Sequence, residues 1–524
     1  MAFFHGITVT EVTSNGVTVQ VVNSAVIGLI GSAPQWLAPV GSGPGINKPT
    51  LVATPSQASV FGQLVQGYTI PYALDAIQDQ GAGTVIVVDV FNPNTHQTTF
   101  TSEAITAPAS VGPPVSLGHM GLVGPGLPNY TIAESTVVVK NAAGSTTYVE
   151  GTDYTIDYVN GLLYTKAGTT ITASEALKVS GAYCDPSKVV ATDIVGTVSG
   201  STYTGIQALQ GTFQTMGLFA KLLITPGFTD EVTSAALLAM ANKIRAIAFT
   251  DAPAQTPVAT AIANRGTSGN AFNQASDRLV LCYPQLLITD LGIVPTGVTV
   301  SPQGVVGYTY ANATVESPKS QWDAGATAAK DLSNGFWFSP SNTPIVGVLG
   351  PDMNIYMSAF DPNSDTNNLN AAGIVTIFNA FGTGYRVWGN RASSFPGSSG
   401  PTTFICIRRT LDVIEQSIQY ASLQFADQPI TNGLINSILT SVNAFLRSLV
   451  QKGALVAGSS VSYNPADNPS TSLANGQIVF RVNVMPPPPA EQIIYNFVVD
   501  TSLLSNLGPT VSSNSNANQV LPTA

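Results

Sequence analysis

GQIVFRVNVMPPPPAEQIIYNFVVDT, at residues 476–501, contains two apolar runs joined by four consecutive prolines. In the first run, residues 477–485, the alternation has a period of two. It places one set of apolar side chains on one face of a strand: Ile478, Phe480, Val482 and Val484. Proline has no backbone N–H to donate, so Pro486–Pro489 must connect the two runs. The second run, Ile493–Val499, is more evenly apolar and predicts a strand that is buried on both faces or paired on both edges.

Two amphipathic helical patterns precede this stretch. Apolar residues recur at helical spacing in Thr410–Phe425, and a second such pattern ends at Gly453, a natural helix stop. Further upstream, Ser317–Ser339 predicts a helix rich in small residues, and Asp361–Asn370 predicts a polar loop. We therefore expect residues 301–507 to combine a small β-sheet with flanking helices.

The N-terminal half alternates strands and helices, which is the order typical of an α/β domain. Thr84–Phe91 predicts a central strand, and Glu231–Arg245 predicts an amphipathic helix. The apolar face of that helix is expected to carry Val232, Ala235, Leu238 and Ile244. We assign residues 25–94 and 186–300 to this domain. Its other elements are expected at Ala25–Pro34, Ser56–Gln80, Gly205–Gly217, Lys221–Pro226, Ala246–Asp251, Pro257–Ala263 and Leu279–Tyr283.

Residues 95–185 interrupt the α/β pattern with strand and turn signals. The runs at residues 135–141, 146–165 and 176–184 are rich in β-branched and aromatic residues, and Asn160-Gly161 marks a turn. We therefore predict an all-β domain inserted into a surface loop, where insertions are tolerated. The fold class expected for the whole chain is α+β or α/β and multidomain.

The N-terminal stretch GITVTEVTSNGVTVQVV, residues 6–22, contains two alternating runs around Asn15-Gly16. Its local pattern favours a β-hairpin, because Asn-Gly suits a two-residue turn. The alternative is an extended arm whose strand completes a sheet elsewhere. At the other end, Gly508–Ala524 is rich in Ser and Asn and is expected to be mobile.

Composition excludes several classes of protein. Only 9% of the 524 residues are charged and 44% are hydrophobic, which is unlike a disordered chain. The formal net charge of −10, without a basic stripe, argues against a nucleic-acid partner. Three widely spaced cysteines, with no signal peptide and no apolar window long enough for a membrane span, suggest a protein assembled in a cytoplasm and not inserted in a membrane.

The sequence contains no recognisable chemistry. There is no Gly-x-Ser-x-Gly elbow, and His5, His96 and His119 are isolated and expected at the surface or in turns. Asp153 and Asp157 would share a strand face and do not suffice for a calcium or glycosidase site. We therefore expect no enzymatic activity, no metal and no cofactor.

The order of several segments resembles the tail sheath proteins of contractile-tailed bacteriophages, which are related to the sheaths of contractile injection systems. The residues that carry this resemblance lie at 369–393, 408–425, 434–455 and 476–500, with GITVTEV and AVIGLIGSAP near the N-terminus and residues 320–342 in the middle. Residues 151–165 and 183–196 are similar to the inserted β domain of some members. Family members often carry Arg-Thr where this chain has Arg391-Ala392, a departure with an expected local effect.

This resemblance implies a structural subunit that polymerises as a helical tube, in six starts, around an inner tail tube. Contraction would drive that tube through the host envelope for genome ejection. The implied partners are other copies of the chain, the inner tube protein, and the baseplate and tail terminator proteins. The implied location is the virion tail, assembled in the host cytoplasm. Residues 301–507 would face the tube, residues 95–185 would face outward, and residues 508–524 would form a mobile tail.

The resemblance also implies that terminal strands are exchanged between subunits, which favours the arm over the hairpin for residues 1–24. An arm of about ten extended residues reaches roughly 33 Å. The candidate exchange residues are Ile7, Val9, Val12, Val17, Val19, Val21, Ile478, Phe480, Val482, Val484, Ile493, Ile494, Tyr495, Phe497 and Val499. The candidate tube-facing residues are Arg408, Arg409 and Glu415, although Arg408-Arg409 also suits a solvated helix start with local salt bridges.

Two alternatives remain open at this stage. The first is the sheath of a phage-tail-like bacteriocin or of a bacterial contractile injection system. The second is a glycan-binding virion surface protein, suggested by the tyrosines of the β insert, which are Tyr148, Tyr154, Tyr158 and Tyr164. The second leaves the C-terminal pattern unexplained.

Overall fold

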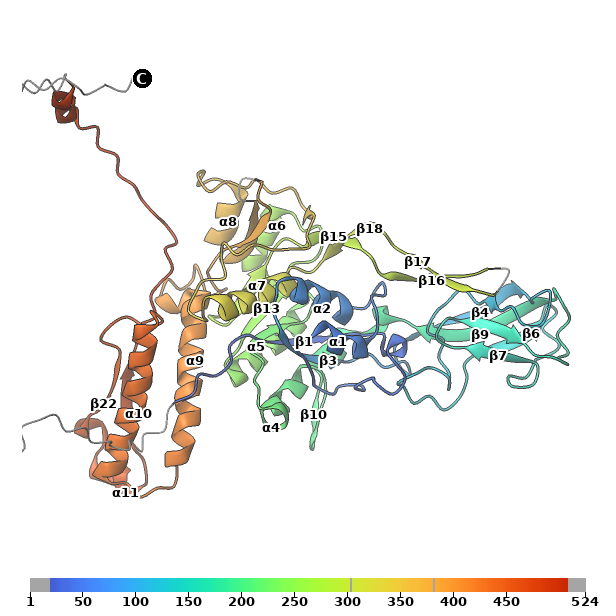
Figure 1. The fold of residues 1–524 in the computed structure, drawn as a ribbon, viewed down its shortest axis with the longest axis horizontal. Helices are drawn as coiled ribbons and strands as arrows, with labels where there is room; N and C mark the ends of the chain where they lie inside the picture. The colour runs from blue at the N-terminus through green and yellow to red at the C-terminus, as the bar shows by residue number, and fades with distance from the viewer. Residues whose placement is uncertain (1–18, 302–303, 380–381, 508–524) are drawn as a thin grey trace, which may run out of the picture. The chain divides into compact units, whose positions relative to one another are not determined.

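The computed structural model describes residues 19–301, 304–379 and 382–507 of the 524-residue chain. Its contacts divide the chain into two units, Met1–Pro489 and Ala490–Ala524. Every sheet found among the described residues lies in the first unit (Figure 1).

An eight-stranded sheet runs through the first unit. Its inner strands, in the order β3, β1, β12, β13, β14 and β20, are parallel neighbours. β2 and β21 pair antiparallel at the two edges. The β1 sequence VIGLIG is buried at every position, as expected of a parallel strand covered on both faces. The bounds are β1 Val26–Gly31, β2 Thr50–Val52, β3 Thr84–Asp89, β12 Leu222–Ile224, β13 Ile247–Asp251, β14 Leu279–Cys282, β20 Ile374–Asn379 and β21 Tyr385–Trp388.

Helices cover both faces of this sheet and confirm the α/β pattern. α2 (Ile70–Asp79) and α7 (Ser320–Ser333) pack against each other and against one face. α5 (Glu231–Ile244) covers the other face. The shorter helices in this part of the chain are α1 (Pro55–Ala58), α3 (Ala191–Val195), α4 (Thr212–Met216) and α6 (Val258–Ala263).

The predicted face of α5 is correct at Ile244 and in part at Leu238, which packs against the core, and it is wrong at Val232 and Ala235, which are exposed. The apolar side chains that it buries are Leu237, Met240, Ala241 and Ile244, whereas Val232 is exposed. The buried stripe also contains the small polar residues Thr233 and Ser234. Hydrophobic periodicity cannot identify such positions, so the sequence places the stripe about one residue away from its true position.

Two segments differ from their sequence-based assignment. The predicted polar loop Asp361–Asn370 contains the start of α8 (Asp365–Ala371), whose first turn is capped by the Ser364 hydroxyl accepting from the Asn367 N–H at 3.3 Å. The central sheet also takes β20 and β21 from beyond residue 300, where the sequence ends the α/β domain. β20 joins because it pairs parallel with β14, a contact between segments far apart in the sequence.

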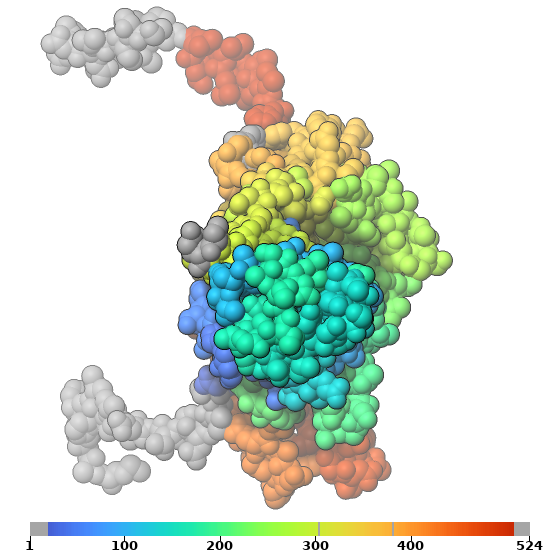
Figure 2. All heavy atoms as spheres, turned by 90° about the vertical axis from the view of Figure 1, so that its right-hand side faces the viewer, coloured from blue at the N-terminus to red at the C-terminus, as the bar shows by residue number. Residues whose placement is uncertain are grey.

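The interval that the sequence predicts to be all-β contains strands and turns and no helix between β3 and residue 185. It forms two three-stranded sheets, ordered β4-β9-β6 and β5-β8-β7. Figure 2 faces this end of the first unit and shows its side chains as a closely packed surface. The strands are β4 Gln97–Thr106, β5 Val115–Ser116, β6 Val138–Asn141, β7 Tyr154–Asp157, β8 Leu162–Thr165 and β9 Ala176–Cys184.

A two-stranded ribbon of β16 (Ile293–Val300) and β17 (Val306–Tyr310) runs from the core to this β insert (Figure 1). The Met120 N–H donates to the Pro295 C=O at 3.0 Å, and the Tyr308 hydroxyl donates to Asn160 Oδ1 at 2.7 Å. The ribbon therefore adds a second attachment to the two chain connections of the insert. Neighbouring short strands are β10 Val198–Ser199, β11 Thr202–Tyr203, β15 Leu286–Asp290, β18 Ala313–Ser317 and β19 Gly350–Pro351.

The predicted C-terminal helices are α9 (Ile405–Ser422) and α10 (Asn432–Gln451). Among the described residues, α10 is the one helix long and apolar enough by composition to cross a membrane. Its apolar stripe instead packs with residues of α9 in a separate hydrophobic cluster that includes Val413, Val442 and Leu446. A two-stranded sheet of β22 (Ser460–Tyr463) and β23 (Phe480–Asn483) joins this cluster, and α11 spans Ser470–Ala474.

The second unit contains the predicted strand Ile493–Val499. That strand is not formed: residues 490–500 have no regular structure and pair with no strand in the part of the chain that the structure describes. A 3-10 helix, Thr501–Asn506, follows. Neither face of Ile493–Val499 is therefore buried within the chain.

Candidate assembly site

The predicted alternation of residues 477–485 is present in β23. Phe480 and Val484 pack against the C-terminal hydrophobic cluster, as their shared face predicts. Val482 lies opposite the buried Val461 of β22 and remains 40% exposed. Ile478 is partly buried and lies before the strand begins. One face of the small sheet therefore packs against α9 and α10. Part of this face, at Val482, remains exposed to solvent.

The two edges of this sheet differ. On the β22 edge, Asn443 of α10 accepts from the Val461 N–H at 3.0 Å and donates to the Val461 C=O at 3.1 Å. Backbone groups in an antiparallel ladder point alternately towards and away from the partner strand, so Val482 also points its N–H and C=O away from β22. Within the described residues β22 is the only strand paired with β23. The β23 edge is therefore open, and the β22 edge is occupied at Val461.

The described part of the predicted N-terminal arm begins at residue 19. Ile7, Val9, Val12 and Val17 lie outside the described residues. Val19 packs partly against the C-terminal hydrophobic cluster, Val21 is exposed, and the Val22 N–H donates to Ser417 Oγ of α9 at 3.1 Å. Residues 19–24 form no strand and run past α9 towards β1 (Figure 1).

The C-terminal segment exposes a row of large apolar side chains. Their exposed fractions range from 67% to 94% and belong to Ile493, Ile494, Tyr495, Phe497, Val498 and Val499. Soluble single chains rarely leave such a contiguous apolar surface uncovered, and a surface of this kind marks an interaction site.

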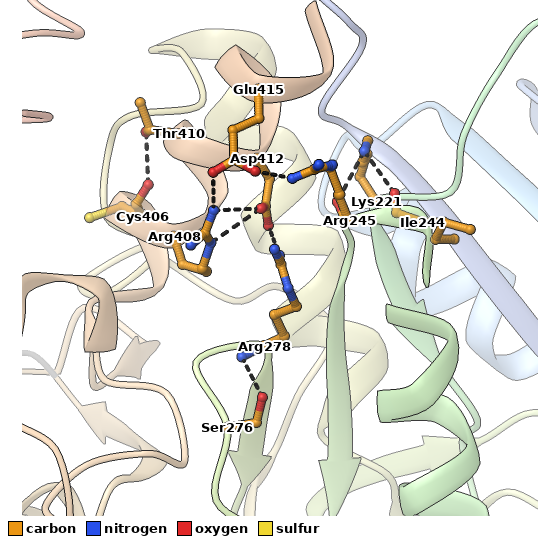
Figure 3. Close-up of polar contacts among 10 residues, drawn as sticks. All are labelled: Lys221, Ile244, Arg245, Ser276, Arg278, Cys406, Arg408, Thr410, Asp412 and Glu415. Carbon is orange, nitrogen blue, oxygen red and sulfur yellow. Dashed lines mark hydrogen bonds and ion pairs between the residues drawn. The ribbon is translucent and has the colours of Figure 1, made fainter. Parts of the chain in front are cut away.

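A charged junction fixes α9 to the central sheet (Figure 3). Within α9, Arg408 pairs with Asp412 at 2.8 Å and with Glu415 at 2.9 Å. Arg278, the residue before β14, also pairs with Asp412, and Arg245, at the C-terminal end of α5, pairs with Glu415. The junction therefore lies at the amino ends of the parallel strands. The β insert follows β3 at the carboxyl ends of the strands, on the opposite side of the sheet.

The predicted tube-facing charges take part in this junction. Arg409 is 4% exposed and forms a buried ion pair with Asp331 of α7, so in this chain its guanidinium does not face solvent. Arg408 and Glu415 are also held by ion pairs within the chain. The sequence could not identify these partners, because Arg278 and Asp412 are 134 residues apart and Asp331 and Arg409 are 78 apart.

Lys221 lies beside the junction, directly before β12, and is also buried. Its ammonium donates to the carbonyl oxygens of Ile244 at 3.1 Å and Arg245 at 3.0 Å (Figure 3). Burial lowers the pKa of Lys221 to about 7, with nearby Asp412 opposing the shift and three arginines adding to it.

Two buried aspartates lie at the carboxyl ends of the central strands. Asp89 is the last residue of β3, and Asp251 is the last residue of β13. Burial raises the pKa values of Asp89 and Asp251 to about 7. Asp89 accepts from the Ala33 and Phe91 N–H groups at 3.0 and 2.9 Å, and Asp251 accepts from the Ser320 N–H at 2.7 Å. Ligands often bind at this edge of α/β sheets, but here the two carboxylates hold loops and the start of α7 in place.

Among the described residues, the histidines and cysteines do not assemble into a site; His5 lies outside them. His96 is buried and pairs with Asp193 at 3.3 Å, contrary to the expected surface position, because its ring packs against Phe91. Cys184, Cys282 and Cys406 are free and buried. In the described part of the chain, no three His, Cys, Asp or Glu side chains come together in a way that could hold a metal.

Sequence comparison finds tail sheath proteins along nearly the whole chain. The sequence model of the phage tail sheath protein central domain matches residues 201–393, and that of the phage tail sheath C-terminal domain matches residues 399–500. The tail sheath protein of Burkholderia phage BcepMu is 39% identical over 96% of this chain and 98% of its own length. The tail sheath protein of Escherichia phage P2 is 25% identical over 62% of this chain and 74% of its own length.

The fold is similar to those of two solved contracted sheaths. The PVC sheath complex of an extracellular contractile injection system gives a TM-score of 0.56 at 14% identity, covering 96% of this chain and 99% of that one. The contracted helical sheath of the anti-feeding prophage gives a TM-score of 0.53 at 16% identity, covering 95% and 100%. These structures support the fold, and the near-full-length sequence match supports the family. The chain therefore belongs to the phage tail sheath family, a family of structural tail proteins.

Proposed function

We propose that the chain polymerises as a contractile tail sheath whose subunits are joined by exchanged terminal strands. The observation that carries this proposal is the coexistence of an open β23 edge with an exposed apolar segment, Ile493–Val499, that pairs with no strand among the described residues. The β23 edge has backbone groups that can pair with a strand, and Ile493–Val499 has a strand-like sequence that needs one. Addition of this segment to the β23 edge of another copy would pair both.

The incoming strand is expected on β23. Asn443 already uses the outward N–H and C=O of Val461, so the β22 edge cannot pair there without losing two hydrogen bonds. The corresponding groups of Val482 have no hydrogen-bond partner within the described residues and can accept an added strand. The N-terminal arm, residues 1–24, is proposed as a second exchanged strand, because its described end leaves the core past α9.

The length of the C-terminal segment is sufficient for exchange. Residues 490–500 follow the prolines, and 11 extended residues span roughly 36 Å at about 3.3 Å each. A strand forming about six ladder bonds contributes roughly 3–9 kcal/mol at about 0.5–1.5 kcal/mol per bond, before burial of its side chains. Such a link can persist while the rigid parts of neighbouring subunits move.

The mechanical role follows from these links. Copies joined head to tail form an open helix, six-start in this proposal, around an inner tail tube. The extended lattice is a kinetically trapped state. A baseplate signal releases it, and subunits then rotate outward about their arms and drive the tube through the host envelope. A tail terminator closes the other end, and the sheath is assembled in the host cytoplasm before it becomes part of the virion tail.

The orientation of the subunit is proposed from the sheet. The C-terminal helices attach at the amino ends of the strands, and the β insert follows the carboxyl end of β3. We place the helical part of the C-terminal region, residues 405–489, towards the tube and residues 95–185 outward, because β17 reaches the insert and β20 and β21 belong to the central sheet. A phage sheath is favoured over a bacterial injection device because the near-full-length relative comes from a phage.

Disulfide trapping in assembled sheaths tests the exchange. Val482→Cys is combined with a cysteine at each position from 493 to 499 in turn, in the full-length chain. The side chains of an added strand alternate between faces, so intermolecular cross-links should form at every second position. Ser462→Cys on β22, combined with the same set, is the matched control and should cross-link poorly.

Three results would reject the proposed edge. One is equal cross-linking at all seven positions, which would show a segment that is not a strand. Another is cross-linking confined to Ser462→Cys, which would place the segment on the β22 edge. A third is cross-linking only within single chains, which would place the segment on its own subunit.

A further inference from the structure

A small cavity lies at the charged junction, between the amino ends of the central strands and α9. It offers about 10 Å³ to the centre of a water-sized sphere, which is enough for one water molecule or an ion of similar size. Its lining residues are Ser24, Lys221, Arg245, Ile247, Arg409, Asp412 and Val413. Figure 3 draws three of these residues at the junction: Lys221, Arg245 and Asp412.

The charges around this cavity are unbalanced. Three cationic side chains line it, Lys221, Arg245 and Arg409, against the single carboxylate of Asp412. That carboxylate is already paired with Arg408 and Arg278. Five cations therefore share three carboxylates in the junction, since Arg245 pairs with Glu415 and Arg409 with Asp331.

Lys221 is the cation without a carboxylate partner among the described residues. Two of its three N–H groups donate to the carbonyl oxygens of Ile244 and Arg245, and its Nζ lies 5.4 Å from the centre of the Phe219 ring. These contacts orient the ammonium beside the cavity but do not neutralise it. A buried charge without a counterion is costly, and the protein can relieve that cost by losing the proton or by binding an anion.

We propose that the cavity binds one small monovalent inorganic anion, of the size of chloride, between Lys221, Arg245 and Arg409. The small volume of the cavity favours a small ion over phosphate, and the surplus of cations selects negative charge. Asp412 lines one side but is flanked by two guanidinium groups, so its repulsion of an anion is reduced.

The direction of the Lys221 pKa agrees with this assignment. Burial lowers that pKa to about 7, Asp412 raises it, and Arg278, Arg245 and Arg409 lower it further. An anion in the cavity would raise it again and keep the ammonium charged. Because Lys221 precedes β12, Arg245 directly follows α5 and Arg409 belongs to α9, the anion would tie the C-terminal helices to the sheet.

Bromide serves as the probe, because it resembles chloride and can be located by anomalous scattering. Crystals of the full-length chain grown in sodium bromide should show an anomalous peak in the cavity. A map with bromide at other places and only a water-sized peak without anomalous signal at this one would overturn the proposal. This measurement needs no variant and is independent of strand exchange, so its failure would leave the proposed function untouched.

Thermal unfolding provides the solution test. At equal ionic strength, the full-length chain should have a higher Tm in sodium chloride than in sodium gluconate, by about 1 °C when chloride is at about ten times its dissociation constant. Lys221→Met should abolish the difference, and Lys243→Met, at an exposed position of α5, should retain it. An equal Tm in the two salts for the unmodified chain would contradict the proposal.

Discussion

Replacing Asp412 with asparagine tests whether the charged junction holds the C-terminal helices on the central sheet. The Asp412 side chain is 3% exposed and accepts from Arg408 of α9 and from Arg278 before β14. Asp412→Asn leaves two guanidinium groups against a neutral amide in a buried place. Removing one partner of a buried ion pair costs about 3–5 kcal/mol.

This cost can be converted into a change in melting temperature. Unfolding entropy near 60 °C is roughly 2.1 cal/mol/K per residue, so cooperative unfolding of 524 residues corresponds to about 1.1 kcal/mol/K. A loss of about 4 kcal/mol should therefore lower the Tm by about 4 °C, measured by scanning calorimetry at a concentration that keeps the chain monomeric.

Glu415→Gln is the matched control for Asp412→Asn. Glu415 pairs with Arg408 and Arg245, but its side chain is 39% exposed, so water screens both pairs. Exposed pairs contribute about 0–1 kcal/mol, and the expected decrease in Tm is at most about 1 °C. Equal decreases for the two variants, or no decrease for Asp412→Asn, would refute the reasoning that burial determines the strength of this junction.

Three further predictions concern the arm, the ribbon and the buried aspartates. Deleting Met1–Val22 should leave a folded monomer that forms no stable sheaths by negative-stain microscopy, and normal contractile tubes would reject the arm assignment. Tyr308→Phe removes the hydrogen bond to Asn160 and should speed amide hydrogen exchange in the β16–β17 ribbon about fivefold, which corresponds to about 1 kcal/mol. Unchanged exchange would show that this bond does not stabilise the ribbon. Asp251 has a folded-state pKa raised from 3.8 to about 7, so its contribution to stability is complete below its unfolded pKa and is lost as the pH rises through about 7. The free energy of unfolding should therefore fall between about pH 4 and pH 7, and Asp251→Asn should flatten that fall in denaturant titrations; an unchanged slope would contradict the assignment.

The sequence predicts most of the central sheet because its strands are apolar over their whole length. β1, β3 and β13 are recognisable without any partner, since both faces of a parallel strand are buried. The boundary at residue 300 could not be placed correctly, because β20 enters the sheet through pairing with β14 and its own residues do not indicate that neighbour.

The assembly site could be predicted only in part, for a related reason. The alternation of β23 and the apolar character of Ile493–Val499 are local properties, and both are visible in the sequence. The role of Asn443, which distinguishes the two edges, depends on α10 bringing its side chain to Val461. The junction at Asp412 likewise depends on an arginine 134 residues away, and no local spacing reveals such a pair.

A density map of the assembled sheath, at a resolution that traces the backbone, tests the exchange of strands between subunits most directly. The predicted result is a strand from residues 493–499 of one copy hydrogen-bonded to the Val482 edge of β23 in another copy, with Asn443 still bonded to Val461. A map in which residues 493–499 fold back onto their own subunit, with no backbone pairing between copies at β23, would contradict it.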